Sequence, residues 1–400
     1  MRVLVVTNLY PPHALGGYEK SCEDVVERWM AAGHEVHVLC TSTRFGGDND
    51  AAPPQRHVSR SLEWYWADHQ VVRPPVRRRV AIERNNQRAL VDALADRPDV
   101  VSFWAMGGTS LGLITTCIEQ DLPMVCVVED DWLVYAPHID AWTSAWSKRP
   151  RWLGRVATRV LRLPTTVPVL PTQSTVAFAS EYLRQRAASD GLIAFSSSAV
   201  VPLGTDPIDF PSRRPGDRPW HGKLLATGRI EPRKGFDTAI RALAELPDAT
   251  LRIIGPGVEE HVAGLRALAT DLGVADRVSI EDAIPRSLLA AAYAEADAYL
   301  FPSRWDEPFG MVPLEAMTQA TPVVATRRGG SAEFLTDGLN CIEVPSDDPV
   351  AIVAAVRALA KDGSLRRRLV NGGLTTSAAY RIDRFASELE ALHLQAASLV

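Results

Sequence analysis

The sequence predicts two α/β domains in tandem, each built on a parallel sheet covered by helices. Short apolar runs alternate with amphipathic stretches through most of the 400 residues. Runs without polar alternation are typical of strands that are buried on both faces. The alternation stops at a segment rich in Pro, Arg, Asp and Gly and starts again near Lys223. The length also suits two domains of about 100–200 residues each.

The first domain contains six predicted strands. They are Val3–Thr7, Val36–Leu39, Val100–Phe103, Met124–Val128, Val176–Ala179 and Ala199–Pro202. The amphipathic stretches Tyr18–Ala31 and Thr109–Glu119 lie between strands and are predicted helices. Gly33 follows the first of them, where glycine commonly ends a helix. This order predicts a doubly wound, Rossmann-like domain.

The second domain repeats the pattern. Its predicted strands are Leu224–Thr227, Leu251–Ile254, Val278–Ile280, Ala298–Phe301, Val323–Ala325 and Cys341–Val344. Its predicted helices are Phe236–Leu246, Val258–Leu272, Val312–Gln319 and Val350–Ala360. We expect domains at 1–206 and 221–380, joined by a linker at 207–220. Ligands bind at the carboxyl ends of such strands, so we expect the two sheets to face a central cleft.

Composition excludes several classes of protein. The formal net charge of −5 gives no reason to expect bulk binding of nucleic acid. The five cysteines show neither Cys-x-x-Cys pairing nor zinc spacing, so we expect buried free thiols in a reducing compartment. The apolar run at the N-terminus is too short for a signal peptide, and no run of about 20 apolar residues exists. We therefore expect no membrane span and a cytoplasmic location.

The strongest chemical signal is the run from Glu307 to Ala316, Glu-Pro-Phe-Gly-Met-Val-Pro-Leu-Glu-Ala. It follows a predicted strand, and a helix is predicted to begin just after Gly310. The first amides of a helix have no partner within it and suit a phosphate or sugar hydroxyls. Two carboxylates eight residues apart, Glu307 and Glu315, suit paired hydroxyl groups of a sugar and a ribose. The competing interpretation makes Glu307 a helix cap and Glu315 part of a solvated face.

A second signal is Thr227-Gly228-Arg229-Ile230-Glu231-Pro232-Arg233-Lys234-Gly235-Phe236. It joins the first strand of the second domain to a helix. Arg229 and Lys234 suit a diphosphate, with a forked and a point charge respectively. Asp48-Asn49-Asp50 has metal-ligand spacing, but it lies in a polar segment of the first domain and is interpreted as a solvated loop. We therefore expect two cations instead of a metal to stabilise a leaving diphosphate.

A third signal is the glycine-rich loop after the first strand, Pro-Pro-His-Ala-Leu-Gly-Gly-Tyr at 11–18. It lacks the G-x-G-x-x-G fingerprint, which argues against a dinucleotide site. The pair Gly16 and Gly17 at a helix start suits approach to phosphate, although a structural turn explains it equally well.

Taken together and in this order, these motifs resemble the family 4 retaining glycosyltransferases of the GT-B fold. The run Arg-Gly-Gly-Ser-Ala-Glu at 328–333 and the run Val-Pro-Leu-Gly-Thr-Asp at 201–206 add to the resemblance, with Leu203 where Asn is usual. The resemblance spans nearly the whole chain, and its most specific part is the Glu-x7-Glu region.

The resemblance implies a role for each matching residue. Arg229 and Lys234 would hold the donor diphosphate, Glu307 the donor sugar and Glu315 the ribose. The remaining donor-binding positions would be Gly16, Gly17, Ile254, Gly255, Ile284, Phe309, Gly310, Met311 and Val312. A helix at about 381–399 would return to the first domain. No metal and no cofactor are implied, because the nucleotide sugar is a substrate.

The acceptor side departs from the family pattern. The family often has His-Asp after the fourth strand, and here Glu129-Asp130-Asp131-Trp132 stands there, with Glu129 in place of His. A carboxylate there suits a hydroxyl of the sugar or the acceptor. The acceptor-side candidates are therefore Glu129, Asp130 and His13, with His138 as a further polar loop position.

The sequence thus predicts a retaining, metal-independent transfer of a sugar, with UDP as the commonest donor nucleotide for the fold and GDP or ADP as alternatives. The acceptor is a glycan, a lipid-linked or a small-molecule hydroxyl. Two other functions stay open, a nucleotide-sugar epimerase of the same fold and a non-catalytic nucleotide-sugar-binding subunit. Acid–base residues at the sugar would favour the epimerase, and tight binding without donor hydrolysis would favour the subunit.

Two segments fall outside the alternation of strands and helices. Gly46–Val80, with Trp64, Tyr65 and Trp66, is predicted as an acceptor loop whose aromatic rings either stack on sugars or pack on the domain. Trp142–Leu163 carries three tryptophans, six basic residues and no acid. We favour a solvated helix for it, with peripheral contact to an anionic membrane as the alternative.

Overall fold

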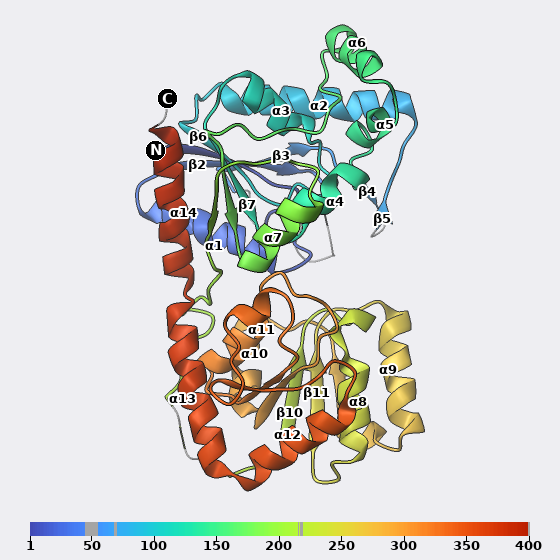
Figure 1. Ribbon diagram of the computed structural model, residues 1–400, viewed down its shortest axis with the longest axis vertical. Coiled ribbons are helices and arrows are strands. Elements are labelled where there is room, and N and C mark those ends of the chain that lie inside the picture. The colour runs from blue at the N-terminus through green and yellow to red at the C-terminus, as the bar shows by residue number, and fades with distance from the viewer. Residues whose placement is uncertain (45–54, 68–69, 215, 217–218, 399–400) are drawn as a thin grey trace. The chain divides into compact units, whose positions relative to one another are not determined.

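The computed structural model describes residues 1–44, 55–67, 70–214, 216 and 219–398. The chain forms two compact units (Figure 1). Unit 1 comprises Met1–Pro202 and Phe385–Val400, and unit 2 comprises Leu203–Arg384. Each unit is a parallel sheet with helices on its faces, so the predicted α/β class and the Rossmann-like plan of each half are confirmed.

Unit 1 contains a seven-stranded sheet in the order β3-β2-β1-β6-β7-β8-β9, with a separate hairpin of β4 and β5. Its strands are β1 (Arg2–Val6), β2 (Glu35–Thr41), β3 (Val58–Leu62), β4 (Trp66–Ala67), β5 (Gln70–Val71), β6 (Val100–Phe103), β7 (Met124–Val128), β8 (Thr175–Phe178) and β9 (Ser198–Val200). Its helices are α1 (Gly17–Ala31), α2 (Val76–Leu94), α3 (Gly112–Glu119), α4 (Trp132–Ile139), α5 (Thr143–Ser147), α6 (Arg151–Leu161), α7 (Glu181–Asp190) and most of α14 (Ile382–Ala397). The sheet is parallel throughout, as buried apolar strands require.

Unit 2 contains a six-stranded parallel sheet in the order β12-β11-β10-β13-β14-β15. Its strands are β10 (Lys223–Thr227), β11 (Thr250–Ile254), β12 (Val278–Glu281), β13 (Ala298–Phe301), β14 (Val323–Ala325) and β15 (Cys341–Glu343). Its helices are α8 (Phe236–Ala244), α9 (Glu259–Asp271), α10 (Arg286–Glu295), α11 (Met311–Thr318), α12 (Pro349–Lys361) and α13 (Gly363–Ala379), with short 3-10 turns η2 (Pro232–Lys234), η3 (Ala275–Arg277) and η4 (Gly330–Glu333). Each predicted strand of this half is present within one residue.

The C-terminal helix α14 packs on unit 1. The indole Nε1 of Trp29 on α1 donates to the carbonyl of Ala386 at 3.1 Å. His393 lies in the interior and pairs its Nε2 with Ser102 Oγ at 2.8 Å, and burial lowers the pKa of His393 to about 4. Unit 1 is therefore built from both ends of the chain, and α14 begins within one residue of the helix predicted at about 381–399.

The described residues of the predicted linker, 207–220, pack on unit 2. Its described residues belong to unit 2, whose first residue is Leu203. Phe210 is buried with its ring centroid 6.1 Å from that of Tyr293, and Trp220 packs against the core cluster of unit 2. Polar composition indicated a linker, but the two aromatic side chains anchor the segment because burying them removes a large apolar area from water.

The described part of the segment 46–80 is built into unit 1, unlike the predicted acceptor loop. Its described part contains β3, which extends the sheet by pairing with β2, and the start of α2. Trp64 and Tyr65 are buried, and Trp66 stacks on Trp64 with centroids 5.3 Å apart, so the alternative of packing on the domain holds for these rings. Asp48-Asn49-Asp50 lies outside the described residues.

Two further expectations concern cysteines and membrane spans. All five cysteines are free and buried, as predicted. Among the helices of the described ranges, none is both long and apolar enough to cross a bilayer.

Helix α2 buries a carboxyl group in unit 1. Glu83 has no exposed surface, and its Oε1 accepts hydrogen bonds from Tyr65 Oη at 2.8 Å and Ser110 Oγ at 2.9 Å. Burial, and then the nearby charge of Asp140, raises the pKa of Glu83 to about 8. An unfolded Glu has a pKa of about 4.3. At a pH between the two values, the Glu83 carboxyl is therefore protonated in the folded protein and ionised in the unfolded chain.

Because of this proton, we expect the protein to lose stability as the pH rises from about 4 to about 8. In that window the folded state binds more protons than the unfolded state, so the free energy of unfolding falls as the pH rises, by at most about 1.4 kcal/mol per pH unit. Glu83→Gln mimics the neutral form and should flatten this slope. Thermal melting across the window checks it, with the exposed Glu119→Gln as control. Equal slopes for wild type and Glu83→Gln would contradict the neutral state.

Candidate functional site

The donor-side motifs meet at one edge of the unit 2 sheet. Strands β10 and β13 are parallel neighbours, so the loops that follow Thr227 and Phe301 leave the sheet at the same edge. The first loop carries Arg229 and Lys234, and the second carries Glu307. The sheet topology thus brings together two motifs that are far apart in sequence.

Lys234 and Glu307 form an ion pair. The Lys234 Nζ lies 2.7 Å from Glu307 Oε1, and Ser303 Oγ donates to the same oxygen at 2.7 Å. The side chains are 19% and 8% exposed, so little water competes with the contact. The backbone of Glu307 is also held, because the amide of Gly330 donates to its carbonyl at 2.6 Å. The sequence predicted these two residues for different parts of a donor, and the structure joins them in one constellation.

Gly235 makes this approach of the two loops sterically feasible. It has φ of +69°, and a Cβ there would lie 2.0 Å from the carbonyl oxygen of Pro302, the residue after β13. Only glycine tolerates both the left-handed backbone and the contact. The turn η2 before it ends at Lys234 and aims that side chain at Glu307.

Glu315 is buried on α11 and is held by a tyrosine. Tyr293 Oη donates to Glu315 Oε2 at 2.8 Å and also lies 2.7 Å from Thr227 Oγ1 at the end of β10. The other oxygen, Oε1, lies 3.9 Å from Arg286 Nη2. Burial raises the pKa of Glu315, against the opposing effects of Arg286 and Tyr293. The carboxyl is thus fixed at one oxygen and faces a cation with the other, and it is not on a solvated face.

The N-terminus of α11 lies directly after Glu307. The helix begins at Met311, one residue before the predicted start, and Gly310 precedes it with φ of +94°. The early amides of Met311 and Val312 have no acceptor within their own helix, while Pro313 contributes no amide. Phe309 is buried between Phe334 and Tyr380, so its side chain anchors the loop. The helix N-terminus therefore places positive partial charge beside the Lys234–Glu307 pair.

The remaining donor-side positions lie at the same edge. Ile254 ends β11, the neighbour of β10, and Gly255 follows it with its amide donating to Glu281 O at 3.0 Å. Ile284 is half-buried just before α10, and the side chain of Arg229 is exposed. The roles implied for these residues in binding a base and a diphosphate stay predictions.

In unit 1, the glycine-rich loop leads into α1. Gly16 precedes the helix and Gly17 is its first residue, and the amide of Gly16 donates to Glu19 Oε2 at 3.0 Å. His13 is buried, and its amide donates to Tyr10 O at 3.2 Å. The structure therefore shows a capped helix start at this loop, and a contact of Gly16 or Gly17 with phosphate stays a prediction.

Glu129 and Asp130 follow β7, and burial raises the pKa of both carboxyl groups. Glu129 is buried and accepts from Ser21 Oγ at 2.8 Å, and burial, reinforced by the charge of Asp130, raises the pKa of Glu129 well above its ordinary value. Asp130 accepts from Trp132 N at 3.0 Å and Tyr135 Oη at 2.8 Å, and burial raises its pKa to about 6. The residue in place of the expected His is thus a buried carboxyl with a raised pKa. His138 is exposed on α4, and its carbonyl accepts a hydrogen bond from Arg73 Nη2 at 3.0 Å.

Sequence reasoning missed Ser303, Tyr293 and Arg286. Ser303 follows the predicted strand by two residues, and that position was the available signal. Tyr293 and Arg286 lie on α10, a helix that the periodicity did not reveal, and they reach Glu315 only through the packing of α10 against α11.

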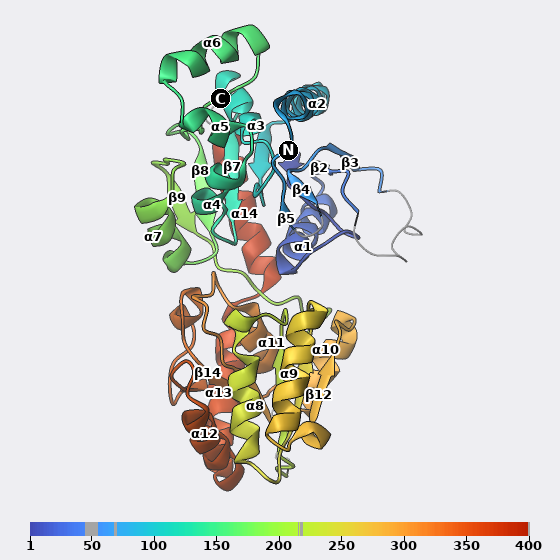
Figure 2. The same cartoon turned by 90° about the vertical axis from the view of Figure 1, so that its right-hand side faces the viewer.

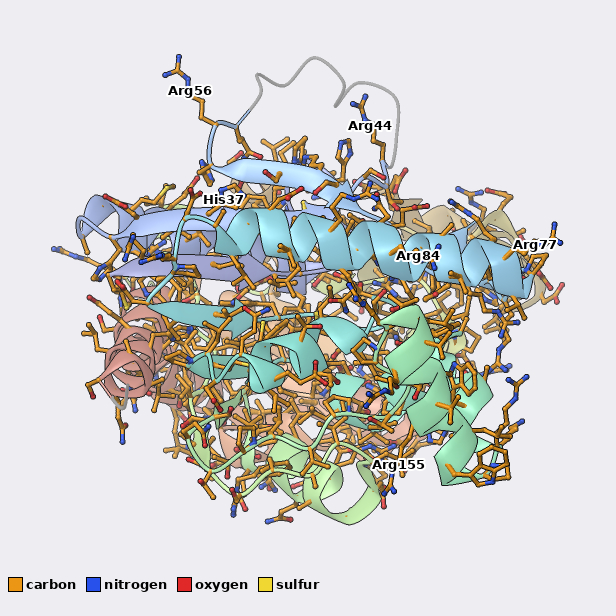
Figure 3. The ribbon with its side chains drawn as sticks, turned by 90° about the horizontal axis from the view of Figure 1, so that it is seen from above. His37, Arg44, Arg56, Arg77, Arg84 and Arg155 are labelled. Atoms are coloured by element: carbon orange, nitrogen blue, oxygen red, sulfur yellow. The ribbon has the colours of Figure 1, made fainter. Side chains whose placement is uncertain are left out.

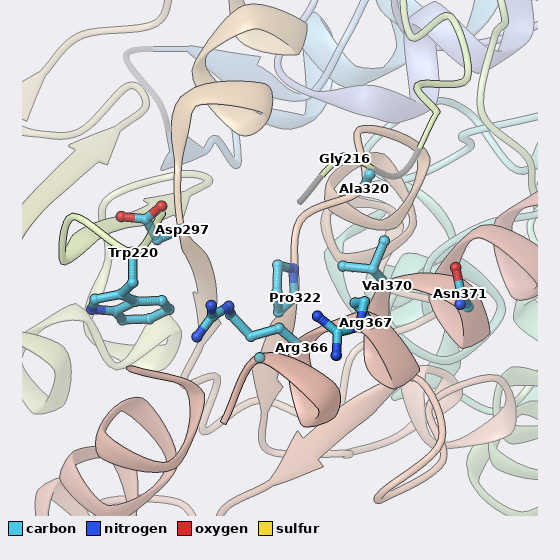
Figure 4. A pocket seen from close by; sticks show the side chains of 10 residues that line it. Gly216, Trp220, Asp297, Ala320, Pro322, Arg366, Arg367, Val370 and Asn371 are labelled. Carbon is cyan, nitrogen blue, oxygen red and sulfur yellow. The ribbon is translucent and has the colours of Figure 1, made fainter. Parts of the chain in front are cut away.

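A separate pocket of about 240 Å³ lies elsewhere in unit 2 (Figure 4). The residues around it include Trp220, Asp297, Arg366 and Arg367, and Arg366 stacks over Trp220 at 5.8 Å. A second hollow of about 400 Å³ lies against α8 and α9 beside η2. None of the predicted donor residues lines either hollow.

Comparison with solved structures identifies the fold class of this chain. Two solved structures share the fold over nearly the whole chain. Sucrose-phosphate synthase from Thermosynechococcus elongatus has a TM-score of 0.73 at 20% identity, covering 100% of both chains. HepE of Anabaena, in complex with UDP and glucose, has a TM-score of 0.69 at 17% identity, covering 98% of both. The fold is that of the GT-B glycosyltransferases.

Two family models match successive parts of the chain, the first ending a few residues after unit 2 begins. Residues 15–208 match the model for "Glycosyltransferase Family 4", and residues 214–375 match the model for "Glycosyl transferases group 1". The two models together match most of the chain, so the resemblance to glycosyltransferase family 4 that the motifs indicated is confirmed.

Curated relatives match over part of their length. A GDP-mannose-dependent alpha-(1-6)-phosphatidylinositol monomannoside mannosyltransferase of Mycolicibacterium smegmatis is 38% identical over 47% of this chain and 53% of its own. A D-inositol 3-phosphate glycosyltransferase of Corynebacterium diphtheriae is 33% identical over 52% of each chain. The lipopolysaccharide core glycosyltransferase LpsE of Rhizobium meliloti is 39% identical over 44% of this chain and 48% of its own. This chain thus spans about half the length of the curated relatives it matches.

Proposed function

We propose that this protein transfers a hexose from a nucleoside diphosphate sugar to a hydroxyl acceptor, with retention of anomeric configuration and without a metal ion. The observation that carries the proposal is the Lys234–Glu307 pair beside the N-terminus of α11, at the carboxyl edge of the unit 2 sheet. Family membership supports it independently.

The proposed donor site assigns each group a separate task. The ammonium of Lys234 and the guanidinium of Arg229 attract the diphosphate, and the amides at the start of α11 add partial positive charge. Glu307, held by Ser303 and Lys234, accepts hydrogen bonds from hydroxyls of the sugar. Glu315, held by Tyr293, accepts the hydroxyls of the ribose. These positive groups gather where charge develops as the diphosphate leaves.

The proposed reaction exchanges two bonds on one face of the sugar. The bond between the anomeric carbon and the diphosphate oxygen breaks, and a bond from the same carbon to the acceptor oxygen forms. The hydroxyl proton of the acceptor passes to an oxygen of the leaving diphosphate. The protein contributes alignment and charge stabilisation, so neither a protein nucleophile nor a metal takes part in the step.

The acceptor side of the proposal rests on Glu129 and Asp130. Burial raises the pKa of Glu129 and so shifts it toward the neutral form, in which a carboxylic acid donates a hydrogen bond as well as accepting one. A neutral acid there suits an oxygen of the acceptor or the sugar. Relatives named for inositol phosphate and for phosphatidylinositol monomannoside fit an acceptor rich in hydroxyls, and we extend that class to this protein.

A thermal-shift panel tests the proposal and identifies the base. The fold alone suggested UDP, HepE was solved with UDP, and a relative is named for GDP-mannose. We expect one of UDP, GDP or ADP to raise the melting temperature by several degrees, because a ligand at a hundred times its Kd stabilises by about 2.7 kcal/mol. The matching nucleotide sugar should then be hydrolysed slowly without an acceptor. Absence of any shift across the panel and its sugars would overturn the proposal.

A further inference from the structure

Helix α6 presents an apolar stripe to solvent. Trp152, Val156 and Val160 are spaced four residues apart and therefore lie along one side of the helix. They are 62%, 52% and 73% exposed. Exposed large apolar side chains are ordinary when scattered, but three in a row on one helix form a patch that indicates contact with another surface.

The opposite side of α6 is fixed to unit 1. Thr165 Oγ1 donates to the carbonyl of Gly154 at 3.0 Å and lies 2.8 Å from Thr158 Oγ1. Leu161 packs against the core cluster that contains Tyr65 and Trp142. The helix is therefore held along its inner side, and the stripe cannot turn inward without breaking these contacts.

Arginines flank the stripe. Arg155, Arg159 and Arg162 are exposed, and none of them forms an ion pair with another residue in the described ranges. The whole segment 142–163 contains no acid. In Figure 2, α6 lies at the margin of unit 1, away from its sheet. Figure 3 shows Arg155 on its own side of unit 1, apart from Arg77 and Arg84 of α2, whose side chains are also exposed.

The chemistry of this surface matches an anionic lipid bilayer. A helix with a tryptophan-containing apolar side and a basic flank lies in the interface between lipid headgroups and acyl chains. Anionic headgroups attract arginine near the bilayer surface. With 11 residues, α6 is too short to span a membrane and long enough to lie on one. A solvated helix, which we favoured from the sequence, explains the arginines but not the exposed stripe.

We propose that unit 1 docks on anionic membranes through the α6 stripe, with Trp152, Val156 and Val160 inserted among the headgroups and Arg155, Arg159 and Arg162 paired with lipid phosphates. This inference is independent of the proposed sugar transfer, because it involves neither the donor site nor the chemistry. It assigns a lipid surface as the partner of a segment that has no part in the site of unit 2.

Vesicle co-sedimentation of the full chain without nucleotide tests the docking. We expect binding to vesicles of phosphatidylcholine and phosphatidylglycerol at low salt, weak binding to phosphatidylcholine alone, and release at high salt through screening. Failure to bind the anionic vesicles at low salt would overturn the inference, and sugar transfer to a soluble acceptor would still be measurable.

Variants locate the contact. Arg155→Gln with Arg159→Gln should lower the partition coefficient about 25-fold, at about fivefold per arginine. Trp152→Glu with Val160→Glu should lower it by at least about tenfold, the equivalent of burying most of one large apolar side chain. The controls are Lys361→Gln and Val350→Glu on α12, because Val350 is 73% exposed like Val160. Unchanged thermal melting shows that each variant folds. Wild-type binding by both α6 variants, or equal loss in the controls, would refute the assignment.

Discussion

Lys234→Ala should lower turnover about a hundredfold, the loss seen when one preorganised donor to a developing negative charge is removed. Lys234 Nζ lies 2.7 Å from Glu307 Oε1 with 19% of its side chain exposed. A donor diphosphate at the N-terminus of α11 would give this ammonium a second anionic partner. Removing the ammonium therefore affects both the leaving diphosphate and the carboxylate that it orients. Initial rates at saturating donor measure the effect.

Three comparisons separate this role from a purely structural ion pair. Lys223→Ala removes an exposed lysine at the start of β10 and should leave turnover unchanged. Lys234→Ala with Glu307→Gln should cost much less than the product of the single losses, because residues that act as a unit are not additive. Thermal melting reports any destabilisation from leaving Glu307 without its cation. Turnover near the wild-type value in a folded Lys234→Ala variant would refute the diphosphate assignment.

Glu315→Gln should weaken nucleotide binding by about ten- to a hundredfold. Hydrogen bonds to a charged group contribute about 1.5–3 kcal/mol each, and the amide replaces the charged acceptor with a neutral group that has one acceptor oxygen. The substitution keeps the shape of a buried side chain, so α11 should stay intact. The Kd for the nucleoside diphosphate, measured by calorimetry, checks the expectation.

Two further variants test whether the weaker binding of Glu315→Gln comes from the loss of a ribose contact. Glu245→Gln changes an exposed carboxylate at the end of α8 and should leave the Kd unaltered. Tyr293→Phe removes the hydroxyl that holds Glu315 Oε2 at 2.8 Å and should weaken binding by a smaller factor than Glu315→Gln. An unaltered affinity in Glu315→Gln would contradict a ribose contact and would leave Glu315 as a structural partner of Tyr293.

Most strands were predictable because a strand that is buried on both faces is a short apolar run in the sequence. Every strand of unit 2 could be predicted, and β13 and β14 are the clearest because all their residues are apolar and buried. Strand β3 of unit 1 could not be predicted, because Val58–Leu62 contains Ser and Arg and becomes a strand only by pairing with β2 at the sheet edge. The segment 207–220 misled for the opposite reason, since its polar composition concealed Phe210 and Trp220 as anchors.

The candidate site divides in the same way. The charged residues could be found from the sequence because each motif lies in a loop between a strand and a helix. The residues that hold these charged groups in place could not be found from the sequence. Ser303 donates a hydrogen bond to Glu307, and Tyr293 donates one to Glu315. Both contacts depend on how separate loops and helices pack together. The neutral tendency of Glu129 depends on burial and on Asp130, which no local pattern reports.

By itself, the sequence determined the α/β class, the two-domain plan and the family, and it predicted the charged residues of a donor site, because local periodicity and motif spacing carry that information. Only the tertiary structure decided that Lys234 and Glu307 are one ion pair, that 207–220 belongs to unit 2, and that α6 exposes Trp152. The physical reason is that ion pairing and exposure depend on neighbours brought together by sheet topology and helix packing, and these neighbours are distant in sequence.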